Sequence, residues 1–100
     1  MSKKYEKVVI KKSSKPEKKY QAILSSKDGK TKTIHFGSAG MSDFTKHKDE
    51  ARKKRYLNRH RKRENWNVPD TAGSLSRWIL WNKKTLRESI EDYKKRFNLT

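Results

Sequence analysis

The chain has no cysteine among its 100 residues, and this absence excludes several classes of small protein. Without cysteine there is no disulfide framework and no thiolate metal site, so a reducing compartment is expected. No apolar run approaches the ~20 residues that a membrane-spanning helix needs. The first residues also lack the apolar stretch of a signal peptide. The sequence therefore predicts a protein that is not secreted and has no membrane partner.

Acidic and hydrophobic residues are also scarce. The chain has 11 Asp and Glu against 28 Lys and Arg, a formal net charge of +17, and only 30% hydrophobic residues. Such a composition is typical of disordered chains, but aromatic residues make up 10%, mostly after residue 35, and predict a small core. Repulsion among like charges destabilises a compact state, and a polyanion relieves that repulsion. The charge therefore predicts a polyanionic partner.

The first part of the chain predicts β-structure. KKYQAILSS and TKTIHF flank the turn dipeptide Asp28-Gly29, which favours a hairpin over roughly residues 18–36. Residues 1–17 form a Lys-rich basic arm, with or without an edge strand at Val8-Val9-Ile10. Residues 18–100 are then one small nucleic-acid-binding domain, because the chain is too short for two cores.

Helices are predicted after the Gly/Ser-rich connector GSAGMSDF, in which Ser42, Asp43 or Thr45 is a candidate cap. Residues 46–63 contain no Gly or Pro and favour one helix. After Pro69, Asp70 or Thr71 caps a short helix. Thr85 and Glu88 have capping-box spacing before a last helix with an apolar stripe, Leu86, Ile90, Tyr93 and Phe97. The predicted fold class is α+β, an N-terminal antiparallel hairpin or small three-stranded sheet packed on about three helices.

The stretch ARKKRYLNRHRKR, residues 51–63, carries the densest positive charge. At 100° per residue, six cations of residues 48–63 fall within a sector of about 100°. This basic stripe consists of Lys48, Arg52, Arg55, Arg59, Lys62 and Arg63. Tyr56, Leu57 and His60 fall on a different sector and are free to face a core. As one helix the stripe spans about 22 Å, which matches several successive phosphates of a duplex.

Three interpretations of the basic stripe stay open: a phosphate-binding surface, a solvated helix face, or a nuclear-import signal. Segregation of the cations on one face favours phosphate binding, because an import signal is read as an extended peptide. Trp81 lies off the face shared by Leu75 and Trp78, so both packing and contact with a base or partner fit it. Trp66 fits either a loop anchor or a stacking platform.

No arrangement of residues predicts catalysis. His35, His47 and His60 have no carboxylate at ligand spacing, so no metal site is expected. GSAG lacks the downstream lysine of a phosphate-binding loop. Ser42 and Asp43 lie near His47 only in sequence, and helix capping explains both. We expect a protein that is not an enzyme, with no catalytic residue, metal or cofactor.

Two stretches carry a resemblance to known proteins. GKTKTIHFGSAGMSDFTKHKDEARKKRYLNRH (residues 29–60) and TAGSLSRWILWNKKTLRESI (residues 71–90) resemble small, basic, poorly characterised proteins of large DNA viruses that infect protists. Ser74 stands where a bulkier apolar residue is expected. The resemblance implies a virion-associated protein, found in the virion and in a host-cell cytoplasmic virus factory or the nucleus.

Charge and resemblance together predict a sequence-independent DNA-binding protein that coats, condenses or packages a viral genome. The expected partner is double-stranded DNA, with RNA as an open alternative, and both a monomer and a homodimer fit the sequence. The alternatives are an RNA-binding module and an interaction protein whose basic surface binds an acidic viral or host protein.

Overall fold

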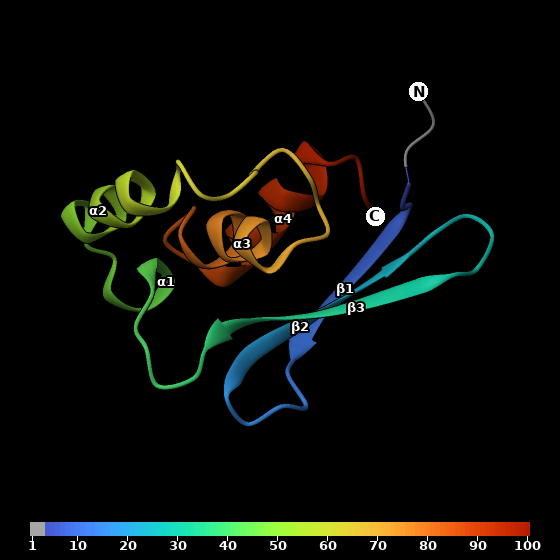
Figure 1. Cartoon of the computed structure of the whole chain (residues 1–100), viewed down its shortest axis with the longest axis horizontal. Coiled ribbons are helices and arrows are strands. Elements are labelled where there is room, and N and C mark those ends of the chain that lie inside the picture. The colour runs from blue at the N-terminus through green and yellow to red at the C-terminus, as the bar shows by residue number, and fades with distance from the viewer. Residues whose placement is uncertain (1–3) are drawn as a thin grey trace.

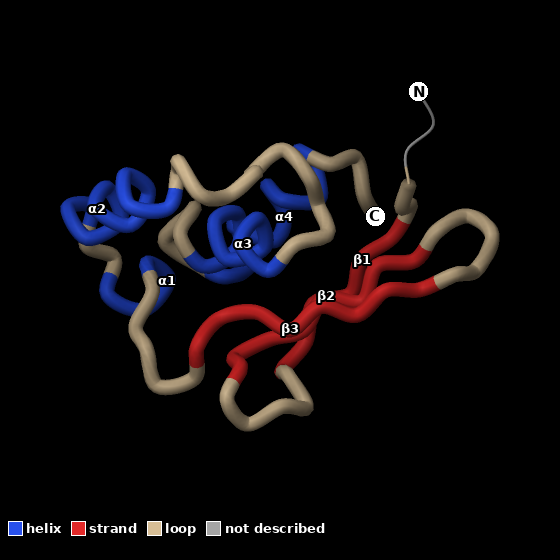
Figure 2. The backbone as a smooth tube through the Cα atoms, viewed as in Figure 1, coloured by secondary structure: helices blue, strands red, loops and turns tan. Residues whose placement is uncertain are grey.

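A three-stranded antiparallel sheet forms one layer of the protein, and helices pack against it (Figure 1). The computed structural model describes residues 4–100. Strands β1 (Lys7–Lys12), β2 (Lys18–Ser25) and β3 (Thr31–Ser38) follow one another in the order β1-β2-β3. Figure 2 shows the strands and the helices as two separate groups along the molecule. The α+β fold class predicted from the sequence is confirmed.

The predicted hairpin is formed by β2 and β3, with Ile23 opposite Thr33. Gly29 has a φ of 89° in the connecting turn, a conformation that glycine adopts without steric cost. The edge strand considered for the basic arm is also formed, since Val9 of β1 lies opposite Ile23. The backbone amide of Val8 donates to the carbonyl of Thr100 at 3.1 Å, so the last residue runs beside this outer strand.

The second layer is a helical stretch and the last helix. Helix α3 (Ala72–Leu75) continues directly into the π-helical turn η1 (Ser76–Leu80), and α4 (Leu86–Arg96) packs on η1. Thr71 and Thr85 cap α3 and α4 by accepting bonds from the amides of Ser74 and Glu88. The predicted caps are thereby confirmed, with Thr71 taking the role left open between Asp70 and Thr71.

The hydrophobic core lies between the sheet and these helices. Its buried members are Tyr5, Val8, Ala22, Leu24, Phe36, Leu75, Ile79, Leu80, Tyr93 and Leu99. Three residues of the predicted last-helix stripe, Leu86, Ile90 and Phe97, are partly buried against it. Ser74 is fully buried despite its small size, so α3 is covered by the rest of the protein.

The single helix predicted over residues 46–63 is wrong. The chain instead forms α1 (Phe44–His47) and α2 (Glu50–His60), followed by a turn over residues 61–63. Asp43 caps α1, and Asp49 caps α2 by accepting from the amides of Ala51 and Arg52. Lys48 between them has a φ of 55° in the left-handed region, which ends α1. A second capping aspartate thus starts a new helix without any Gly or Pro.

Gly37 allows β3 to approach the helical layer. Its φ is 79°, and a Cβ there would lie 2.8 Å from Leu80 Cδ1. Gly40 has a similar φ of 86°, but nothing lies within 4 Å of its Cβ position.

We expect Gly37→Ala to lower the free energy of unfolding by about 1–3 kcal/mol more than Gly40→Ala. Both variants carry the backbone strain, and only the first adds a steric clash.

Urea unfolding of the two variants measures this difference. Equal losses of stability in Gly37→Ala and Gly40→Ala would show that the close approach of Gly37 to Leu80 does not constrain the fold.

Candidate nucleic-acid interface

A column of aromatic rings attaches α2 to the rest of the protein. Tyr56 stacks on Trp81 with ring centroids 4.3 Å apart and planes 4° from parallel. His60 stacks on Tyr56 at 4.3 Å, and His47 of α1 lies 5.3 Å from Trp81. No residue of α2 is buried, and this aromatic column joins the helix to Trp81 and, through it, to α1. The sequence left two roles open for Trp81, packing within the protein or contact with a base or partner. The structure shows that Trp81 packs against Tyr56 and His47.

Polar contacts support the same attachment. Lys53 Nζ donates to the carbonyl of Asn82 at 2.7 Å and lies 4.8 Å from the centre of the Phe44 ring. Burial lowers the pKa of Lys53. Burial and the nearby Glu64 carboxylate raise the pKa of Tyr56, so its phenol remains neutral at physiological pH.

Arg77 is a cation with a structural role. Its guanidinium lies 4.1 Å from the centre of the Trp78 ring and donates from Nη1 to the carbonyl of Trp81 at 2.9 Å. Burial lowers the pKa of Arg77. Trp78 Nε1 donates to the carbonyl of Trp66 at 2.8 Å, which fits the interpretation of Trp66 as a loop anchor.

The basic stripe is divided among three segments. Lys48 lies in the left-handed link before α2, and Lys62 and Arg63 lie in the turn after it. Only Arg52, Arg55 and Arg59 lie on α2, whose 11 residues span about 16 Å. All six side chains are exposed. The helical part of the basic stripe is therefore shorter than the about 22 Å expected from one continuous helix.

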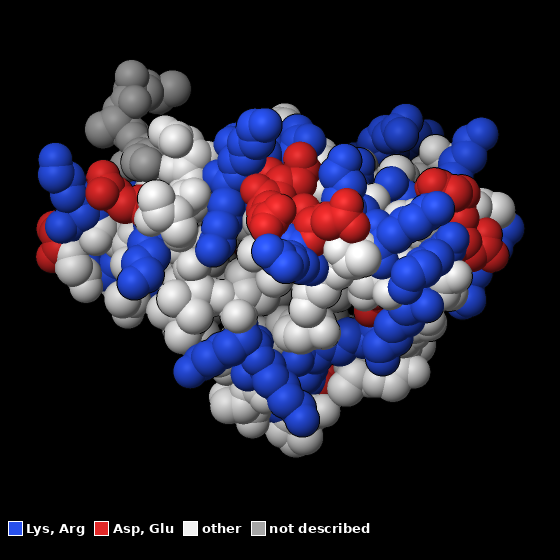
Figure 3. All heavy atoms as spheres, turned by 180° about the vertical axis from the view of Figure 1, so that it is seen from behind, with Lys and Arg blue, Asp and Glu red and all other residues white. Residues whose placement is uncertain are grey.

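None of these six cations forms an ion pair with a carboxylate within residues 4–100. Several Asp and Glu side chains instead cap helices or contact other residues. Asp43 and Asp49 are caps, and Asp70 contacts Lys4, Lys32 and Tyr5. Figure 3 shows Lys and Arg side chains over much of the back of the molecule, including the end that carries α2. The positive charge of the basic stripe is thus left without a carboxylate partner.

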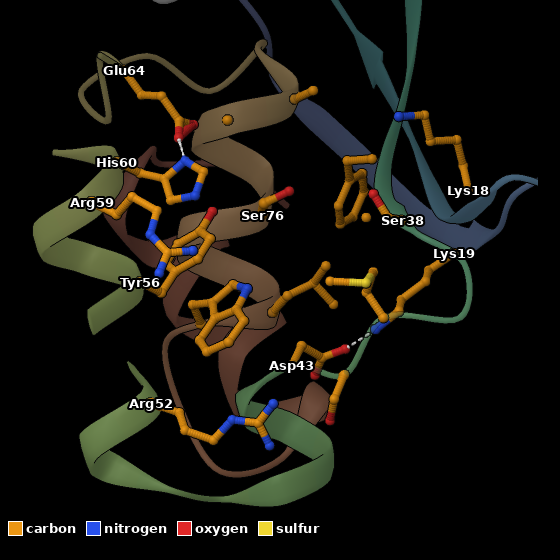
Figure 4. Close-up of a pocket in the computed structure, with 18 of the residues that line it drawn as sticks. Lys18, Lys19, Ser38, Asp43, Arg52, Tyr56, Arg59, His60, Glu64 and Ser76 are labelled. Carbon is orange, nitrogen blue, oxygen red and sulfur yellow. Dashed lines mark hydrogen bonds and ion pairs between the residues drawn. The ribbon is translucent and has the colours of Figure 1, made fainter. Parts of the chain in front are cut away.

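A cleft of about 520 Å³ opens beside α2 (Figure 4). One wall is α2, with Arg52, Arg55 and Arg59; the other comes from the ends of β2 and β3 and the connector after β3. Helix α3 and η1 provide Gly73, Ser76 and Leu80. Tyr56 and Arg59 lie only about 60° apart on α2, so the sector with Tyr56 adjoins the basic stripe. The three arginines of α2 therefore border a concave surface.

The two carboxylates that line the cleft each have a partner. Asp43 is 2% exposed, and its Oδ2 lies 2.5 Å from Lys19 Nζ. His60 Nδ1 lies 2.5 Å from Glu64 Oε1 on the opposite side of the cleft (Figure 4). Within residues 4–100, neither carboxylate forms an ion pair with the arginines of α2. The cleft has an electropositive wall suited to phosphate groups.

Sequence reasoning missed the residues that face α2 across the cleft. Lys18, Ser38, Met41 and Ser76 belong to four different segments, and no local pattern links them to residues 52–59. The connector with Met41 was identified only as a link to a helix. These residues come together through the tertiary fold, so their role in one surface is visible only in three dimensions.

Residues 4–100 contain neither a candidate metal site nor a helix that could span a membrane. Within residues 4–100 no group of three or more His, Asp or Glu side chains is arranged to hold a metal ion. In the same part of the chain, no helix combines the length and apolar character needed to cross a bilayer.

The aromatic column generates a prediction about the attachment of α2. A stacked aromatic pair contributes about 0.5–1.5 kcal/mol beyond its buried area. In Trp81→Ala we therefore expect amide hydrogen exchange in α2 to accelerate by about tenfold, while exchange in β2 changes much less. Trp81→Phe keeps a ring against Tyr56 and is expected to retain most of the protection. Unchanged exchange in α2 of Trp81→Ala would contradict this role of the aromatic column.

Comparison with known proteins identifies a family for the chain. A family model described as a family of unknown function, DUF5754, matches residues 8–60. The matched segment contains β1 except for Lys7, all of β2, β3, α1 and α2, and four of the six stripe residues. No curated protein and no solved structure matches the chain. Because the match extends over more than half of the residues, the protein belongs to DUF5754, a family of unknown function.

Proposed function

We propose that the protein binds double-stranded DNA without sequence specificity, through the basic stripe on and around α2. The observation that carries the proposal is the set of six exposed cations that have no carboxylate partner within residues 4–100. Cations of this kind contact phosphates and release condensed counterions, which drives sequence-independent binding. A net charge of +17 further favours association with a polyanion.

The proposed role is to coat, condense or package a viral genome without catalysis. Its support is the resemblance of residues 29–60 and 71–90 to small basic proteins of large DNA viruses, together with the positive charge. The proposed locations are the virion and the virus factory or nucleus. An acidic protein is the rival partner for the same surface, and competition by random-sequence duplex DNA separates the two functions.

The first test is the salt dependence of duplex binding. If the six stripe cations each neutralise one phosphate, the slope of log K against log salt is about −5. Affinity for a random-sequence duplex is then expected to fall by about three orders of magnitude between 50 and 200 mM salt. Fluorescence anisotropy with a labelled duplex measures this fall. An affinity independent of salt would contradict the electrostatic mechanism.

The second test separates the basic stripe from the total charge. One variant changes Arg52, Arg55, Arg59 and Arg63 to Gln, and a matched variant changes Lys7, Lys11, Lys12 and Lys15 to Gln. Both lower the net charge from +17 to +13, and all eight side chains are exposed. Glutamine retains good helix propensity on α2.

We expect the variant with four arginines changed to lose more affinity for duplex DNA and to flatten the salt slope by up to about four units. The variant with four lysines changed keeps the bidentate arginine contacts and is expected to lose less affinity. Binding isotherms at several salt concentrations, with circular dichroism to verify folding, measure both effects. Equal losses in two folded variants would mean that total charge, rather than the basic stripe, governs binding.

A further inference from the structure

The cleft beside α2 is too small to enclose a DNA duplex. Its volume of about 520 Å³ lies in the range of small-ligand sites, about 300–1,000 Å³. A duplex is a much larger body, whose major groove alone is about 12 Å wide. A single nucleotide, by contrast, has the dimensions of a small ligand. The cleft therefore has room for one unpaired nucleotide but not for a duplex.

The lining of the cleft combines the features that a nucleotide requires. Arg52 and Arg59 extend from α2 along one wall, and Lys19 on the opposite wall is already paired with Asp43 (Figure 4). Hydroxyl groups of Ser38 and Ser76 offer donors and acceptors for a sugar or a base edge. The unpaired guanidinium groups suit a phosphate, which they bind in bidentate fashion.

Apolar surface is also present in the cleft. Met41, one of the exposed large hydrophobic residues of the chain, lines it with 65% of its surface accessible. Tyr56 and Trp81 also line the cleft. Because the faces of these two rings stack on each other, a base in the cleft would contact their edges and the thioether of Met41. The combination of a cationic wall, hydroxyls and apolar surface matches the phosphate, sugar and base of one nucleotide.

We propose that this cleft binds an unpaired nucleotide of a single-stranded DNA segment, so that the protein prefers duplexes with single-stranded tails to continuous duplexes. The inference rests on the proposed function, because it also takes DNA as the partner. The duplex part contacts the stripe cations outside the cleft, Lys48, Lys62 and Arg63, and the tail enters the cleft between α2 and the end of the sheet. Other proteins bind single strands by combining a basic groove with aromatic side chains that contact the bases, and here Met41 and the ring edges of Tyr56 and Trp81 provide the apolar contact.

The experiment compares three labelled DNAs of matched charge at fixed salt: a continuous duplex, a duplex with a single-stranded tail, and a single strand. Met41→Glu places a negative charge in the cleft, at an exposed position where misfolding is not expected. Val9→Glu is the matched control, because Val9 is also an exposed large hydrophobic residue, 41% accessible, and it does not line the cleft. Each variant lowers the net charge by one unit, from +17 to +16.

We expect the tailed duplex to bind about tenfold more tightly than the continuous duplex. Met41→Glu is expected to abolish this difference, whereas Val9→Glu preserves it and weakens both DNAs equally. Unlabelled single strand is expected to displace the tailed duplex better than polyglutamate of equal charge does.

Two results would overturn the inference and leave the proposed function standing. One is equal affinity of the unaltered protein for tailed and continuous duplexes; the other is a tail preference that Met41→Glu and Val9→Glu reduce to the same extent. If polyglutamate displaces the tailed duplex as well as the single strand does, the cleft recognises charge alone and the inference also fails. Absence of binding to all three DNAs would overturn the inference and the proposed function together.

Discussion

The stack of Tyr56 on Trp81 is the contact on which the basic surface depends. Helix α2 has no buried residue, and it carries cations that repel one another. Its own apolar surface cannot hold it against the protein, since few of its side chains are apolar. The parallel rings at 4.3 Å, extended by His60 and His47, join α2 to η1 and α1. Together with the contacts of Lys53 to Asn82 and Phe44, this aromatic column holds the arginines of α2 in position beside the cleft.

The distribution of the few acidic residues determines where the positive charge remains available. Asp43 both caps α1 and pairs with Lys19 in a largely buried site, which links β2 to the start of the helices. Glu64 pairs with His60 beside the cleft, and a Cβ on Gly73 would lie within 2 Å of its carboxylate, so the two residues are closely packed. These acids stabilise the scaffold and leave the arginines of α2 uncompensated, which makes a polyanion the natural complement.

Much of the fold was predictable because it follows from local patterns. The turn at Asp28-Gly29 and the apolar spacing of the last helix each depend on neighbouring residues, and both predictions are confirmed. The break at Lys48 was missed because neither Gly nor Pro marks it. Its signal was the pair of capping aspartates, Asp43 and Asp49, of which only the first was considered as a cap.

Of the two walls of the cleft, only the one formed by α2 could be predicted from the sequence. Clustering of Arg52, Arg55 and Arg59 follows from helix geometry, and the structure places all three on α2. The opposite wall of the cleft depends on long-range packing of β2, β3 and η1, which no local pattern encodes. Helical periodicity therefore predicts the cluster of cations, whereas the concave surface that they border is visible only in the tertiary structure.

The central claim is that α2 and the cleft, rather than the charge of the whole chain, form the DNA-binding surface. Backbone amide chemical shifts, followed by NMR during titration with a random-sequence duplex at physiological salt, test this claim most directly. The account predicts the largest shifts over residues 48–63 and in the cleft-lining connector, with small changes over β1 and the turn after it. Shifts spread evenly over the lysines of the whole chain, or centred on β1, would contradict it.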